Sequence, residues 1–168
     1  PDDKLFFMRI EAELLEDKTS IEDLKDHLSK TDSEVDGNSK VFDKQKKQNI
    51  AILVTKESLP LYDILIKNQT QEINSNIKTI ISNHKVLEPI SDQFDIEYRY
   101  LDLSDKSYAE KELLSILEQQ EIDLIILARY MQIIPDSIVS RYKDRMINIH
   151  HGFLPAFKGQ RPYHKAWE

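Results

Sequence analysis

Ile50-Ala51-Ile52-Leu53-Val54 is an unbroken apolar run that follows the polar stretch Lys44–Asn49. A strand that is apolar at every position is typical of a parallel sheet, because helices cover both of its faces. Two more mostly apolar runs, at 77–81 and 124–128, follow at wide intervals along the chain. We therefore expect strands at 50–54, 77–81 and 124–128, all nearly inaccessible to solvent.

Segments with the pattern of helices separate the strands from one another. The expected helices cover residues 59–67, 86–94, 108–120 and 135–142. Further strands are predicted at 96–101 and 145–149, so strands and helices alternate along this part of the chain. Such alternation implies right-handed crossovers between parallel strands. The sequence therefore predicts an α/β fold with a doubly wound, mainly parallel sheet.

The turn after the first of these strands reads Thr55-Lys56-Glu57-Ser58 and contains no glycine. Dinucleotide-binding folds place a glycine-rich turn here, because the backbone has to approach the pyrophosphate closely. The alternation of strands and helices alone would fit such a fold. The missing glycines argue against an NAD-type cofactor.

Asn148 and His150 stand at the exit of the last predicted strand, in the stretch Asn148-Ile149-His150-His151-Gly152. Residues two apart on an extended backbone point to the same side. A hydrogen-bond donor beside a proton acceptor suits carbonyl chemistry, which needs one group for the oxyanion and one for the proton. A plainer interpretation is also open, in which Asn148 caps a turn and His150 is an ordinary hydrogen-bonded polar residue.

A metal ion is a further possibility for His150, His151 and His164. Zinc sites need three or four ligands at a fitting spacing, and adjacent histidines on an extended chain face opposite ways. We therefore expect no metal, and we interpret His151 as a residue that orients the loop or lines a pocket.

The stretch from Asn148 to Gly159, with Leu154-Pro155 inside it, and the following residues 162–168 resemble the signature of the folate-dependent formyltransferase family. The double histidine and the sequence Phe-Leu-Pro-Ala-Phe-Lys-Gly are most similar to its deformylase branch. The resemblance implies a formyltransferase-like, Rossmann-like catalytic domain that hydrolyses 10-formyltetrahydrofolate to formate and tetrahydrofolate. The folate is then the substrate, and no cofactor is expected.

The same resemblance implies that Asn148 and His150 are the catalytic residues. The asparagine amide would donate to the formyl oxygen, and the histidine would handle the proton. The third catalytic residue of the family is an aspartate that lies further downstream than Glu168. We therefore expect the 168 residues alone to be inactive.

Substrate-binding residues are implied on two segments. Ala128–Ile134 resembles the family segment that holds the pterin ring, and the second segment surrounds the Leu-Pro pair. The residues implied are Arg129, Tyr130, Met131, Ile133, Ile134, His151, Gly152, Leu154 and Pro155. Ordinary core packing at a strand exit remains an alternative for each apolar residue of the first segment.

Two other functions stay open. One is transfer of the formyl group to an amine such as glycinamide ribonucleotide. Members with that activity use a glycine-containing loop after the first strand and usually carry proline at the position of His151, so the sequence favours water as the acceptor. The other is a non-catalytic role as a regulatory or assembly module.

The first 47 residues differ from the rest in pattern. Leu5–Glu13 alternates and predicts a strand, Ser20 is a candidate helix N-cap, and residues 44–49 look like a linker. This part resembles the second half of an ACT regulatory module, which implies an amino-acid effector and a homo-oligomer. The expected domains are this partial module at 1–47 and the first part of the catalytic domain at 48–168, with its carboxyl-terminal part absent.

Composition excludes several classes of protein. The chain carries 23 Lys and Arg against 30 Asp and Glu, a formal net charge of −7, so we expect no general binding to nucleic acid or to a membrane surface. No apolar run approaches the roughly 20 residues of a membrane span. The absence of cysteine is compatible with a cytoplasmic location, which we expect.

Overall fold

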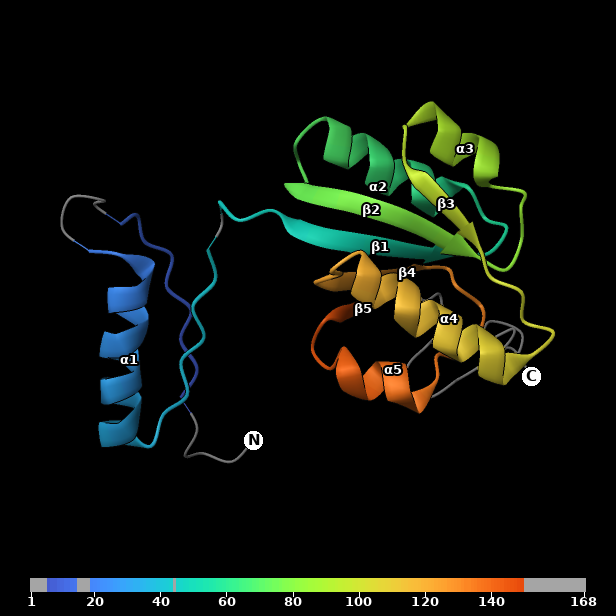
Figure 1. Ribbon diagram of the computed structural model, residues 1–168. Coiled ribbons are helices and arrows are strands. Elements are labelled where there is room, and N and C mark those ends of the chain that lie inside the picture. Colours follow the sequence, from blue (N-terminus) through green and yellow to red (C-terminus); the bar gives the residue numbers. More distant parts are fainter. Residues whose placement is uncertain (1–5, 15–18, 44, 150–168) are drawn as a thin grey trace, which may run out of the picture. The chain divides into compact units, whose positions relative to one another are not determined.

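The computed structural model describes residues 6–14, 19–43 and 45–149 (Figure 1). The chain divides into two compact units, Pro1–Lys46 and Lys47–Glu168.

The second unit contains a five-stranded sheet within the described residues, and every neighbouring pair of its strands is parallel. The strands are β1 (Gln48–Val54), β2 (Ser75–Ser82), β3 (Glu97–Tyr100), β4 (Leu124–Ala128) and β5 (Met146–Ile149). The helices between them are α2 (Leu59–Gln69), α3 (Glu88–Gln93), α4 (Lys106–Gln119) and α5 (Asp136–Arg141). The strand order is β3-β2-β1-β4-β5, which confirms the predicted α/β class with a parallel sheet.

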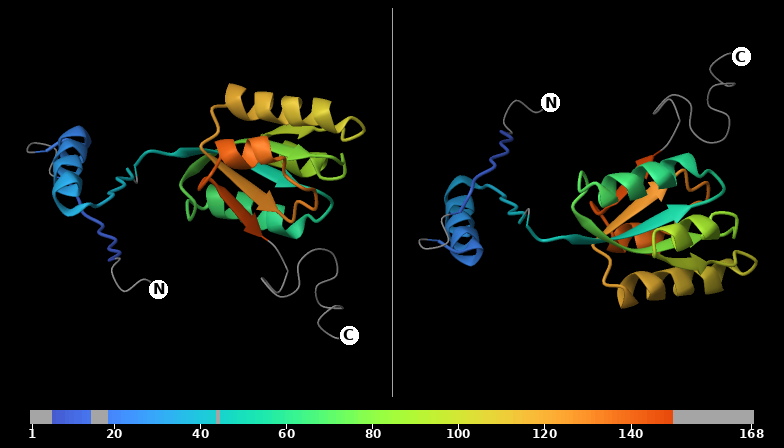
Figure 2. Two further views of the ribbon diagram at one scale, coloured as in Figure 1. Left: turned by 90° about the horizontal axis from the view of Figure 1, so that it is seen from below. Right: turned by 90° about the horizontal axis from the view of Figure 1, so that it is seen from above.

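Helices cover both faces of the sheet, as Figure 1 shows with α2 and α3 above it and α4 and α5 below it. The view from below in Figure 2 places α5 on the near side of the sheet. Side chains on the upper face form the α2/α3-side cluster, which includes Ile52, Ile80, Ile126 and Ala128. Those on the lower face form the α4/α5-side cluster, which includes Ala51, Leu53, Ile125, Leu127 and Ile138. Consecutive residues of β1 and β4 thus enter opposite clusters, as the pleat of a strand requires.

The amino edge of the sheet is closed by Asn49 and Asp123. The backbone N–H of Asn49 donates to the Asp123 carboxylate at 2.9 Å, and the Asp123 N–H donates to the Asn49 carbonyl at 2.8 Å. The Asn49 side chain donates in turn to the carbonyl of Glu121 at 3.1 Å. This clasp joins the first residues of β1 to the chain entering β4, directly after residues 45–47.

The predicted burial is confirmed for the runs 50–54 and 124–128 and is wrong for part of the run 77–81. Residues 50–54 are all buried, and 124–128 are buried except for the partly exposed Leu124. In the run 77–81, however, Ile77 is partly exposed and Lys78 is exposed. Ile50 pairs with Ile77 and Ala51 pairs with Thr79, so Lys78 is the extra residue of a β-bulge. The bulge leaves the charged Lys78 outside the regular pairing of β2 with β1.

The first unit contains one helix in its described residues, α1 (Ile21–Val35). Ser20 is its N-cap, as predicted, and it forms a capping box with Asp23. The strand predicted at 5–13 is wrong as far as the structure describes it, because residues 6–14 form neither helix nor strand. A strand needs a partner for its backbone groups, and no other strand lies within 19–43.

Candidate active site

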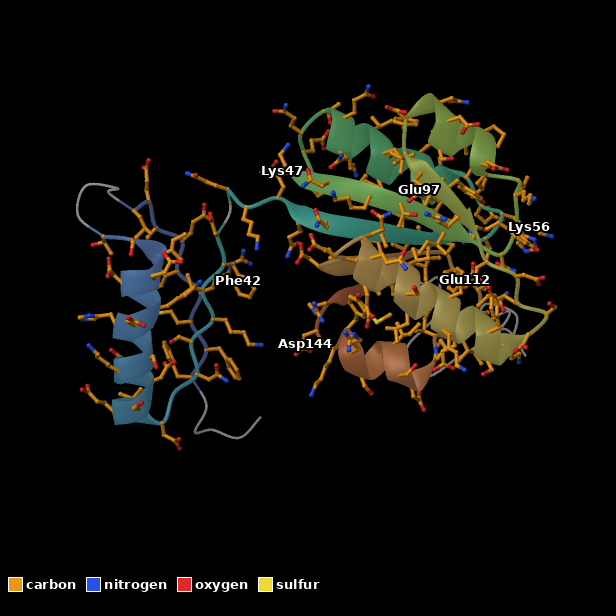
Figure 3. All side chains as sticks on the ribbon, in the orientation of Figure 1. Phe42, Lys47, Lys56, Glu97, Glu112 and Asp144 are labelled. Atoms are coloured by element: carbon orange, nitrogen blue, oxygen red, sulfur yellow. The ribbon has the colours of Figure 1, made fainter. Side chains whose placement is uncertain are left out.

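The predicted site residues that the structure describes, in 129–134 and at Asn148, lie at the carboxyl edge of the sheet. Lys47 and Lys56, labelled in Figure 3, mark the amino and carboxyl ends of β1. The chain proceeds from β1 to β2 and β3 on one side, and then to β4 and β5 on the other. The carboxyl ends of β1 and β4 therefore form the topological switch point, where open α/β sheets bind ligands.

Arg129 changes the direction of the chain directly after β4. It adopts the left-handed backbone region, with φ of 54°, and its N–H donates to the Leu127 carbonyl at 3.1 Å. Left-handed backbone is uncommon for a residue with a Cβ, although five other non-glycine residues of the described chain also adopt it. The predicted substrate segment Arg129–Ile134 thus begins at a sharp turn rather than as a continuation of the strand.

The apolar residues of this segment divide between solvent and core. Met131 is 46% exposed and Ile133 is 97% exposed, whereas Ile134 is partly buried and packs against the α4/α5-side cluster. Tyr130 is a member of that cluster and is only 8% exposed. Burial raises the pKa of Tyr130 to about 12, so its hydroxyl stays protonated near neutral pH. Met131 and Ile133 are therefore the members of the segment that are open to a ligand.

Asn148 lies on β5, beside the residues that lead into this segment. Asn148 pairs with Leu127 and Ile149 pairs with Ala128. The partner of Asn148 on β4 therefore lies only two residues before Arg129. Met146 packs against the α4/α5-side cluster, and Asn148, two residues on, points to the same face. Asn148 is exposed. His150, His151, Gly152, Leu154 and Pro155 lie outside the described residues.

A series of hydrogen bonds runs along the carboxyl edge across four strands. The Tyr98 hydroxyl donates to the His84 carbonyl, and the His84 N–H donates to the Ser82 hydroxyl oxygen at 3.1 Å. Ser82 Oγ donates to the Thr55 carbonyl at 3.3 Å, and Thr55 Oγ1 donates to the Arg129 carbonyl at 3.0 Å. Thr55 and Ser82 were not expected as site residues. The sequence feature that could have indicated them is a hydroxyl residue at the end of a mainly apolar run, Thr55 after 50–54 and Ser82 after 77–81.

Two buried polar atoms at this edge have no hydrogen-bond partner among the described residues: Arg129 Nε and Asn83 Oδ1. Asn83 follows β2 as Arg129 follows β4, so the two flank the end of β1. The remainder of the Arg129 guanidinium has a nearby carboxylate, with Nη1 3.8 Å from Glu57 Oε2. Unpaired buried polar groups are rare in folded proteins, and a ligand or an ordered water is the usual partner of those that occur.

The described part of the chain holds no group of three or more His, Cys, Asp or Glu arranged for a metal ion. It also contains no helix long and apolar enough to span a bilayer. The histidine trio considered from the sequence, His150, His151 and His164, falls outside the residues that are described.

Comparison with known proteins identifies the family. The Formyl transferase family model matches residues 48–168. The chain is 38% identical to a protein of Haemophilus influenzae named formyltetrahydrofolate deformylase, over 98% of this chain and 58% of that protein. This chain therefore spans a little over half the length of that relative.

Two solved structures agree with the family model. The crystal structure of a formyltetrahydrofolate deformylase from Pseudomonas syringae is similar at a TM-score of 0.83 and 31% identity, covering 89% of this chain and 51% of that one. Glycinamide ribonucleotide transformylase 1 from Geobacillus kaustophilus shares the fold at a TM-score of 0.66 and 23% identity, covering 73% of this chain and 68% of that one. With a parallel sheet of this order and a family model that matches nearly all of the second unit, the chain belongs to the formyl transferase family.

Proposed function

We propose that the full-length protein hydrolyses 10-formyltetrahydrofolate to formate and tetrahydrofolate. The observation that carries the proposal is the 38% identity to the Haemophilus influenzae deformylase across 98% of this chain. The reaction needs only water and the folate, so no cofactor is part of the proposal. In the reaction, the oxygen of water bonds to the formyl carbon, and the bond from that carbon to N10 of the folate breaks. One proton of the water passes to N10.

Asn148 and His150 are the proposed catalytic residues. The Asn148 amide would donate to the formyl oxygen as it gains negative charge, and His150 would take the proton from water and return it to N10. The position of Asn148 supports this role, because this exposed residue stands on β5 near the carboxyl edge of the sheet.

The proposed pterin wall is the segment Arg129–Ile134. The exposure of Met131 and Ile133 supports it, since a flat heteroaromatic ring would cover apolar side chains that the described residues leave open. Tyr130 would support the segment by anchoring it to the α4/α5-side cluster. His151, Gly152, Leu154 and Pro155 complete the proposed pocket on the grounds of the sequence motif alone.

Water is the proposed acceptor rather than a phosphorylated amine. The turn after β1 supports this choice in two ways. It contains no glycine that would let backbone amides cradle a phosphate, and it presents the carboxylate of Glu57 next to Arg129. The Glu57 carboxylate would repel a phosphorylated acceptor. It also lies beside the Arg129 guanidinium, the cation that could otherwise attract a phosphate.

The direct test is formate release from 10-formyltetrahydrofolate by the full-length protein without any amine. We expect one formate and one tetrahydrofolate per substrate consumed, at a rate that added glycinamide ribonucleotide does not change. The 168-residue chain alone is expected to release none, because the third catalytic residue is proposed to lie beyond Glu168. Formation of a formylated amine in place of formate would refute the hydrolase assignment.

For residues 1–47 we propose a partial ACT-like module. This module would bind an amino-acid effector and contribute to a homo-oligomer. The proposed location of the protein is the cytoplasm. The helix α1 with its predicted N-cap supports the module, and the absence of cysteine is compatible with the cytoplasmic location. Calorimetric titration of the full-length protein with the twenty amino acids is expected to give a saturable signal for one or a few. A flat response to all of them would remove the effector.

A further inference from the structure

Thr55 is the first residue after β1, and it contacts the first residue after β4. Its side chain is only 7% exposed, and its hydroxyl donates to the carbonyl of Arg129 at 3.0 Å. The two residues are 74 positions apart in the chain. The parallel pairing of Val54 with Ala128 brings them side by side. This bond therefore joins the ends of the two strands that form the switch point.

The carbonyl that Thr55 holds belongs to the left-handed residue of the turn. A left-handed residue with a Cβ persists only where its surroundings hold it. Both backbone polar groups of Arg129 are held here, the N–H by Leu127 and the carbonyl by Thr55. Because the Arg129 carbonyl is part of the peptide plane leading to Tyr130, fixing it also fixes the direction in which the chain leaves the strand.

The turn changes which face of the sheet the following side chain joins. Ile126 and Ala128 belong to the α2/α3-side cluster, and simple alternation would send Tyr130 to that same cluster. Tyr130 instead packs in the α4/α5-side cluster. The left-handed conformation of Arg129 thus directs the next side chain, Tyr130, to the opposite face of the sheet. It leaves Met131 and Ile133 exposed at the edge.

Thr55 is itself held from the opposite side. Its carbonyl accepts from Ser82 Oγ at 3.3 Å, and Ser82 Oγ accepts in turn from the N–H of His84 at 3.1 Å. Thr55 therefore stands between two neighbouring strands, bonded to β2 by its carbonyl and to the end of β4 by its hydroxyl. Thr55 can therefore restrain the segment that follows β4, because it is itself fixed to the sheet.

We propose that Thr55 is the positioning residue for Arg129–Ile134, holding that segment in the conformation that presents Met131 and Ile133 to the substrate. The inference rests on the proposed function, in which this segment is the pterin wall. Thr55 would touch no reacting atom. Its contribution would be to substrate affinity, because a wall that is already ordered loses less entropy when the ligand binds.

The experiment uses the full-length protein with Thr55→Val, which removes the hydroxyl but keeps the shape, and Thr55→Ser, which keeps the hydroxyl. The matched control is Thr79→Val, because Thr79 is also fully buried and donates to a backbone carbonyl, that of Glu97, at 3.3 Å on the β3 side of the sheet. The measurements are kcat and KM for 10-formyltetrahydrofolate, and hydrogen–deuterium exchange of the peptide covering 129–134.

For Thr55→Val we expect KM to rise roughly five- to tenfold, the equivalent of one hydrogen bond, with kcat within about twofold of normal. Exchange in 129–134 should accelerate in this variant. Thr55→Ser should restore both quantities, and Thr79→Val should leave both unchanged while lowering the melting temperature. Unchanged exchange in Thr55→Val, or equal rises of KM in Thr55→Val and Thr79→Val, would overturn the proposal.

The exchange measurement also separates this inference from the proposed function. If the unmodified protein does not turn over or bind a formylfolate, the proposed function is wrong whatever Thr55 does. Faster exchange of 129–134 in Thr55→Val alone would then still identify Thr55 as the residue that positions the segment, without a role toward folate.

Discussion

Replacing Asn148 by alanine in the full-length protein is expected to lower turnover of 10-formyltetrahydrofolate by a factor on the order of 10²–10³, the usual cost of losing one oxyanion donor. KM should change little, because the oxyanion that the amide would stabilise exists only in the transition state. Steady-state formate release over a range of folate concentrations separates kcat from KM and measures both effects.

The matched control for this variant is Asn76→Ala. Asn76 is also an exposed asparagine on a strand of the same sheet, but it lies at the amino edge, where its amide donates to Asn49 Oδ1 at 3.3 Å. Its replacement should leave turnover near normal. If Asn148→Ala also keeps near-normal turnover, the assignment of Asn148 to the oxyanion is wrong.

His150→Ala is expected to cost a factor of about 10²–10⁴ in turnover, through the loss of proton transfer. The pH dependence gives a sharper test than the rate alone. A general base must be deprotonated to act, so the rate of the unmodified enzyme should fall on the acidic side as the base gains its proton, and the variant should lose this fall.

The control for the histidine is His27→Ala, because His27 is exposed on α1. That variant should retain both the rate and its pH dependence. An acidic limb that persists unchanged in His150→Ala would assign the titrating base to another group and contradict the proposed role.

The sequence predicted the layers of the second unit correctly because the two runs at 50–54 and 124–128 are apolar on both faces. The run 50–54 has no polar residue, so its burial between two helical layers followed directly. Lys78 shows the limit of such reasoning. A lysine inside an apolar run is tolerated because a β-bulge removes it from the ladder, and pairing irregularities are set by contacts between distant segments.

The site was predictable only in part, for a related reason. Asn148 could be proposed from the sequence because it stands two residues from a histidine within one short motif. Thr55 and Ser82 could not be proposed from the sequence, because their contacts depend on which strands are neighbours. Their hydrogen bonds cross 74 and 27 residues of sequence. The predicted strand at 5–13 failed for the converse reason, since its alternating pattern found no partner strand within 19–43.

The clasp between Asn49 and Asp123 has a mechanical consequence. Residues 45–47 lead directly into β1, which lies at the centre of the sheet with parallel neighbours on both sides. A pull on these residues along the strand direction loads the bonds from β1 to β2 and to β4 together, in shear. A strand that is paired on one side only within the described residues, such as β3, could instead be peeled away one bond at a time. Asn49, the second residue of β1, is among the first residues to bear such tension, and its backbone is bonded to Asp123 in both directions.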